Sequence, residues 1–173
     1  VDLDATANTI TVNVTAVNDE PAGANKTVTT LEDTDYTFAA ADFGFTDASD
    51  TPANALTSVK ITTLPGAGSL KNNGVAINAG DFIAVADITA SKLKFTPAAN
   101  ANGAGYASFT FQVKDDGGTA NAGVDLDATA NTITVNVTAV NDEPAGANKT
   151  VTTLEDTDYT FAAADFGFTD ASD

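Results

Sequence analysis

Short stretches in which apolar and polar residues alternate recur along the chain, and such alternation is typical of half-buried β-strands. The clearest example is Tyr106–Lys114, in which Phe109, Phe111 and Val113 alternate with polar residues. Two short runs flank Asn72-Asn73-Gly74, and these residues predict a tight hairpin because Asn and Gly accept positive φ. The pattern therefore predicts a succession of short strands joined by turns.

About seven such strands are expected in one complete domain, and only Ala39–Asp42 has the composition of a helical turn. Many short strands separated by turn residues predict an all-β fold, namely an antiparallel Greek-key β-sandwich. Residues 81–88 are apolar but irregular, so no regular element is predicted there. The aromatic residues at inward positions are expected to form the core: Tyr36, Phe38, Phe45, Phe95, Phe109 and Phe111.

Residues 1–50 return without a change at 124–173, which is an offset of 123 residues. This offset exceeds the ~20–50 residues of a solenoid unit and matches the size of one sandwich domain. Each Asn-Asp-Glu-Pro motif is expected to end a strand and mark a junction, because proline cannot donate to a β-ladder. With the junctions at these motifs, residues 1–17 are the last strand of a preceding repeat, 18–140 are a complete repeat, and 141–173 are the linker and first strands of the next. A boundary near Asp50 is the alternative.

The chain has 24 acidic residues against 7 lysines, which gives a net charge of −17. This charge argues against nucleic acid as a partner, because nucleic-acid binding needs basic surfaces. No apolar run in the sequence approaches the ~20 residues of a membrane-spanning helix, so we expect no membrane insertion. The sequence has no cysteine or histidine, which excludes disulfides and leaves oxygen ligands, the kind that calcium prefers.

Acidic residues gather at the expected start of the complete domain and in the loops after its first, second and penultimate strands: Asp19, Glu32, Asp47, Asp50, Asp115 and Asp116. We expect these residues to meet at one end of the sandwich, together with Asn18. Calcium binds ~6–8 oxygen atoms, so such a cluster predicts a calcium site. Asp125 and Asp127 form a weaker candidate, because one loop supplies few ligands. The alternative is a solvated acidic surface that keeps the protein soluble.

Several of these motifs resemble the cadherin-like tandem repeats of large bacterial surface adhesins: Asn18–Pro21, Leu31–Thr34, Asp47–Asp50, Phe111–Gly118 and Thr138–Asp142. The stretch from Gly68 to Pro97 is similar to the related proteoglycan-type repeat. The resemblance covers the whole repeat unit, and it implies a cadherin- or Ig-like sandwich with calcium bound between domains.

Carried over residue by residue, the resemblance assigns the first junction to Asn18, Asp19, Glu32, Asp47 and Asp115 or Asp116. It assigns the second junction to Asn141, Asp142, Glu155 and Asp170. Ala16 and Glu20 depart from the family pattern around the Asn-Asp motif, which implies one or two ions per junction rather than three.

These observations predict a structural repeat of a long secreted or surface-attached bacterial adhesin or extracellular fibre, stiffened by calcium at its junctions. The expected partners are neighbouring repeats of the same chain and other copies in a fibre, and the flanks are expected to be ordered only where such partners complete them. The alternative function is a module that binds carbohydrate or matrix. Catalysis is not expected, because histidine, cysteine and arginine are all absent.

Overall fold

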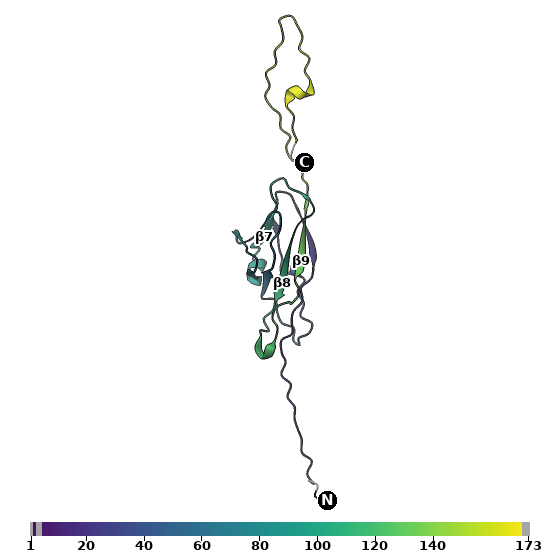
Figure 1. The fold of residues 1–173 in the computed structure, drawn as a ribbon, viewed down its shortest axis with the longest axis vertical. Coiled ribbons are helices and arrows are strands. Elements are labelled where there is room, and N and C mark those ends of the chain that lie inside the picture. Colours follow the sequence, from purple (N-terminus) through teal and green to yellow (C-terminus); the bar gives the residue numbers. More distant parts are fainter. Residues whose placement is uncertain (1, 3–4, 171–173) are drawn as a thin grey trace.

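The computed structural model describes residue 2 and residues 5–170. A single β-sandwich occupies the middle of the chain, and the two flanks project from opposite ends of it (Figure 1). Residues 1, 3 and 4 of the expected preceding strand lie outside the described residues. No helix in the described part of the chain has the length and apolarity needed to cross a membrane.

Nine strands in the described part of the chain form two sheets, which confirms the all-β sandwich predicted from the alternating pattern. The five-stranded sheet has the order β1-β9-β8-β3-β6, and the four-stranded sheet has the order β2-β7-β4-β5. In chain order the strands are β1 (Lys26–Leu31), β2 (Tyr36–Thr37), β3 (Ser58–Ile61), β4 (Ser69–Asn72), β5 (Val75–Ala76), β6 (Phe82–Ala84), β7 (Leu93–Thr96), β8 (Gly103–Lys114) and β9 (Asn131–Thr138). The hairpin between β4 and β5 has positive φ at Asn73 and Gly74, as the turn residues predict.

One strand pair departs from the expected antiparallel arrangement. β1 pairs with β9 in parallel, in a register that runs from Lys26 opposite Ile133 to Leu31 opposite Thr138. All other pairs between named strands are antiparallel. Because β1 and β9 run in the same direction, the end of β1 lies at the end of the domain where the chain leaves it.

The described residues also form four short helices, three between strands and one in the C-terminal flank: η1 (Ala40–Phe43), α1 (Val85–Thr89), η2 (Ala120–Ala122) and η3 (Ala163–Phe166). The first lies where a helical turn was expected. Most of residues 81–88, where no regular element was predicted, lie in β6 and α1. Ile83 and Ile88 from this segment are both buried, so core packing rather than local periodicity determines its conformation.

The core lies between the two sheets and is built from inward-facing residues of both. Phe38, Phe95, Phe109 and Phe111 are fully buried, as predicted, whereas Tyr36 and Phe45 are only partly buried at its margin. Phe43, which was not among the predicted core residues, is also fully buried and packs edge-to-face on Phe111 with ring centroids 4.9 Å apart. Its place on η1 puts it outside the strand pattern on which the core prediction was based.

The N-terminal flank has the same sequence as β9 but a different environment. Ile10, Val12 and Val14 are 78–91% exposed, whereas their copies in β9, namely Ile133, Val135 and Val137, are 0–4% exposed. Residues 9–17 form no strand, although their pattern predicts one. An extended segment needs a partner to complete its backbone hydrogen bonds, and only the second copy has β1 and β8 on either side.

The C-terminal flank keeps a local structure that the complete domain also contains. Lys26 and Tyr36 both contact the buried carboxylate of Asp42, which also accepts a bond from the Ala39 N–H. The copies of these residues repeat the arrangement around Asp165, whose pKa is lowered to about 2 by the ion pair with Lys149 and the N–H of Ala162. These contacts around the aspartate therefore form from local sequence alone, without the rest of the sandwich.

Candidate metal centre at the ends of the domain

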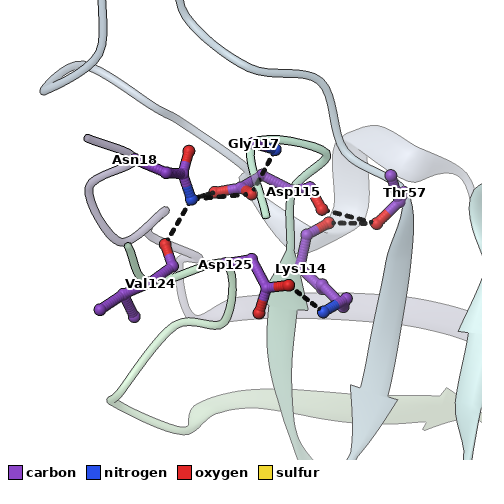
Figure 2. A network of polar contacts seen from close by, with 7 residues as sticks. All are labelled: Asn18, Thr57, Lys114, Asp115, Gly117, Val124 and Asp125. Carbon is purple, nitrogen blue, oxygen red and sulfur yellow. Dashed lines mark hydrogen bonds and ion pairs between the residues drawn. The ribbon is translucent and has the colours of Figure 1, made fainter. Parts of the chain in front are cut away.

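Asn18 joins the start of the domain to the loop after β8. We define the N-terminal pole as the end of the sandwich that contains Asn18, Asp19, Asp47, Asp50, Asn54, Asp115 and Asp116. The Asn18 amide donates to Asp115 Oδ1 at 3.2 Å and to the Val124 carbonyl at 2.6 Å (Figure 2). The Val124 N–H in turn donates to the Asn18 carbonyl at 2.9 Å. These contacts hold the junction residue against the loop that carries Asp115.

Asn54 links the remaining acids of this pole, and sequence reasoning missed it. Its backbone N–H donates to Asp47 Oδ2 at 2.5 Å, and its side-chain amide donates to the Asn18 oxygen and to Asp50. Asp50 also accepts a bond from the backbone N–H of Asp19 at 2.9 Å. The available signal was the position of Asn54 in the same loop as Asp47 and Asp50, because an amide between two carboxylates is suited to bridge them.

Asp116 is held at the same pole through its side chain. Asp116 Oδ1 accepts a bond from the backbone N–H of Ala55 at 2.7 Å. Six of the seven predicted residues of the first junction therefore meet at the N-terminal pole, as the sequence predicts. They come from the junction, the loop before β3 and the loop after β8.

Asp47 is the acid of the N-terminal pole whose hydrogen bonding is incomplete. Its side chain is 6% exposed, and Oδ1 is buried without a hydrogen-bond partner in the described structure. Burial raises the pKa of the neighbouring Asp115; bonds from Gly117 and Asn18 oppose this shift, while the charges of Asp47 and Asp125 add to it. Asp115 accepts bonds from Asn18 and Gly117, whereas one oxygen of Asp47 has none. A bound cation would satisfy that oxygen and offset the charge of both buried carboxylates.

The candidate ligands at the N-terminal pole are not all acidic. Within the described residues, no three acidic side chains lie close enough together to form a metal-binding group by themselves. An ion at the pole would therefore also need amide or carbonyl oxygens. Asn18 and Asn54 offer such oxygens beside Asp47 and Asp115, and calcium accepts oxygens of all three kinds. The residues present therefore fit calcium on the chemistry of the donor set and on the orphaned oxygen of Asp47.

Glu32 lies at the opposite end of the domain, which corrects the expectation that it joins the other acids. Its backbone N–H donates to the Thr138 carbonyl, and its carboxylate accepts bonds from the Val140 N–H at 2.5 Å and the Asn102 amide at 3.0 Å. The cause is the parallel pairing of β1 with β9, which carries the end of β1 to the chain's exit. The Val140 N–H, followed by Asn102, lowers the pKa of this almost fully buried carboxyl.

Glu32 consequently lies next to the second junction. We define the C-terminal pole as Glu32, Asn102, Val140, Asn141 and Asp142. Asn141 is exposed and Asp142 is half-buried, and the Asn141 amide donates to the Asp142 carbonyl at 2.8 Å. Asn102 was not among the predicted site residues, and the structure places its amide on Glu32.

The remaining predicted residues of the second junction, Glu155 and Asp170, are exposed in the C-terminal flank. Glu155 is the sequence copy of Glu32. In a complete following repeat it would therefore lie at that repeat's far end, away from the Asn141 junction. Asp170 is the copy of Asp47, which belongs to the junction end.

Asp125 and Asp127 are held by protein groups. Lys114 forms an ion pair with Asp125 (Figure 2). The buried Asp127 accepts bonds from the N–H groups of Gly23 and Thr129 and from the Asn131 amide, all at 2.8–2.9 Å. These contacts give both carboxylates a structural role in the loop between β8 and β9.

Comparison with known proteins identifies one family. A family model described as a bacterial Ig domain matches residues 18–138, which is most of the chain. The match begins at Asn18, where the Asn-Asp-Glu-Pro motif begins. No curated protein and no solved structure gave a significant match.

Proposed function

The chain belongs to the bacterial Ig domain family, and we propose that it is a structural repeat whose junctions are stiffened by calcium in a long bacterial adhesin or extracellular fibre. Domains of this family are structural rather than catalytic, and they usually occur in extracellular or surface proteins. The internal identity of residues 1–50 and 124–173 supports an array of such domains in series.

The observation that carries the proposal is the buried, unpartnered Oδ1 of Asp47 at the junction. Calcium there would be held by the carboxylates of Asp47 and Asp115 and by oxygens of the junction residue Asn18. Such an ion would neutralise buried charge and fix the junction segment on the domain that follows it. Asp50 and Asp116, on the same pole, add charge that attracts the cation.

The placement of Glu32 supports a composite junction. The C-terminal pole of one repeat ends in Asn141 and Asp142, which are the copies of Asn18 and Asp19. Glu32 of that repeat therefore lies beside the segment that begins the next N-terminal pole. An ion bound at the junction would thus lie between two domains and connect them.

Thermal unfolding of the full chain tests calcium binding. At free calcium of about 100 times the dissociation constant, a single site stabilises the folded state by about 2.7 kcal/mol, so the midpoint should rise with calcium and fall with chelator. Asp47→Asn should abolish the rise. Asp81→Asn removes an exposed carboxylate that accepts a bond from the nearby Asn78 N–H, and it should leave the calcium effect intact.

Small-angle scattering tests the stiffening. A tandem chain with two complete copies of 18–140 should have a larger, sharply defined maximum dimension in calcium and a broader distribution in chelator. Identical scattering in both conditions would contradict the proposal, even if calcium stabilised each domain.

A further inference from the structure

Lys71 differs from the other lysines of this strongly acidic chain. Five of the seven lysines form ion pairs with carboxylates, and Lys60 lies over the ring of Phe82 at 5.7 Å. Among the residues that the structure describes, Lys71 alone has neither a carboxylate within ion-pair distance nor an aromatic ring beneath its ammonium group. With 24 acidic residues in the chain, this lack of a partner requires an explanation.

The strand register makes the position of Lys71 more unusual. Lys71 on β4 lies directly opposite Lys94 on β7, so two like charges share one face of the four-stranded sheet. Like charges directly opposite each other destabilise a sheet. Lysines often protect exposed edge strands from pairing, but β4 and β7 are the two central strands of this sheet. Edge protection therefore does not explain the pair.

The two lysines line a surface pocket of about 430 Å³ together with Lys92. The other lining groups are polar or small: Asp35, Asn73, Gly74, Ser91 and Thr96. Lys94 lies 3.6 Å from Asp35, and Lys92 pairs at 2.7 Å with Asp87 outside the lining. Three ammonium groups thus face two carboxylates, which leaves a local excess of positive charge.

The lining indicates the chemical class of the ligand. A volume of about 430 Å³ is within the range of small-molecule sites. In the same row of the sheet, Thr37 pairs with Lys94 and Ala76 pairs with Lys71, and both are exposed. This face thus lacks the large apolar side chains that form the centre of a protein interface. Hydroxyl and amide groups around ammonium groups instead suit a hydroxyl-rich anion.

We propose that the pocket around Lys71, Lys92 and Lys94 binds the carboxylate or sulfate group of an acidic saccharide. Lys71 and Lys94 would provide the charge-assisted contacts, and Asn73, Ser91 and Thr96 would contact the sugar hydroxyls. The net negative charge of the chain opposes this binding weakly, because charges beyond about 8 Å are screened at physiological ionic strength. One pocket per repeat would let an array bind a long polysaccharide with an avidity that a single repeat lacks.

Affinity electrophoresis of the full chain tests the site, with polygalacturonate as the carboxylate probe, dextran sulfate as the sulfate probe and dextran as the neutral control. All gels contain chelator, so that calcium cannot bridge polysaccharide and protein carboxylates. One charged probe or both should retard the chain and dextran should not, and the probe that acts identifies the anion. Lys71→Gln should weaken binding by about fivefold, which is the upper end of the range for an exposed ion pair.

Lys60→Gln is the matched control, because it removes one lysine from the other sheet. Lys71→Gln should melt no lower than the parent, since it relieves the like-charge pair, and this result shows that lost binding is not unfolding. The proposal is overturned if neither charged probe retards the chain, or if both substitutions weaken binding equally. Self-association that depends on Lys71 in sedimentation, without any polysaccharide, would overturn it in favour of a second copy as the partner.

Discussion

Asn18 and Asp115 are separated by 97 positions in the sequence, yet the Asn18 amide donates to the Asp115 carboxylate at 3.2 Å. This bond attaches the junction to the loop after β8. It also depends on the absence of a side chain at Gly117, whose backbone N–H donates to the same carboxylate at 2.9 Å.

Gly117→Ala should disrupt the N-terminal pole. A Cβ atom at this position would lie 1.7 Å from the Asn18 side-chain oxygen and 2.4 Å from the Asn54 amide nitrogen, so both side chains would have to move. We expect a loss of about 1–3 kcal/mol in the free energy of unfolding, as for other overpacked sites. Chemical denaturation measures this loss.

Gly66→Ala is the control for that substitution, because a Cβ atom there meets nothing within 4 Å and the backbone does not have positive φ. Its effect should stay within about 0.5 kcal/mol. Equal effects of the two substitutions would contradict the proposed packing of Asn18 and Asn54 around Gly117.

The duplicated sequence offers a direct test of which segment completes the domain. Ile133→Ala removes a fully buried side chain and should cost about 2–5 kcal/mol. Ile10→Ala changes the same residue in the same local sequence, but Ile10 is 89% exposed, so the cost should be below about 0.5 kcal/mol. Denaturation curves of the two variants distinguish them, and a larger effect at Ile10 would place the domain boundary elsewhere.

Asp115 and Glu32 should respond to pH in opposite ways in the absence of calcium. A carboxyl with a raised pKa, such as Asp115, contributes stability only while it is protonated, and this contribution is lost as pH rises through its folded-state pKa. Asp115→Asn should therefore stabilise the chelated protein at pH 7, and the gain should disappear in acid. In calcium, the same substitution should remove the stabilisation by the ion.

Glu32 has a lowered pKa, so its contribution to stability depends on pH in the opposite direction. Its contribution is present above the unfolded-state pKa and is lost as pH falls through the folded-state pKa. Glu32→Gln should therefore destabilise the chelated protein at pH 7 and have no effect in acid. Unfolding midpoints of both variants, measured from acid to pH 7 in chelator, test these predictions. If both substitutions stabilised the protein at pH 7, or both destabilised it, the assignment of the two environments would be contradicted.

The alternating pattern was sufficient to predict much of the fold and part of the site. Phe109 and Phe111 are buried because a strand places every second side chain on the same face. Asn18, Asp47 and Asp115 meet because the sandwich returns their loops to one end. These outcomes follow from local periodicity and from the general topology of sandwiches, and both can be recognised in one sequence.

Other features depend on which strands pair, and the sequence does not contain that information locally. Glu32 was expected at the wrong end because nothing in its segment indicates a parallel pairing with β9. The opposition of Lys71 and Lys94 likewise results from the register of two strands that are far apart in the chain. Asn54 belongs to no recognisable motif. Its place in the loop of Asp47 and Asp50 is the only signal in the sequence, and the folded loop shows that it bridges Asn18 and Asp50.

Calorimetric titration of calcium into the metal-free full chain tests the central claim most directly. We predict a saturable binding heat for the parent and for Asp81→Asn, and the loss of that heat in Asp47→Asn, because the buried oxygen of Asp47 is the proposed ligand and has no hydrogen-bond partner. The absence of binding to the parent, or unchanged binding to Asp47→Asn, would contradict a calcium site at the N-terminal pole.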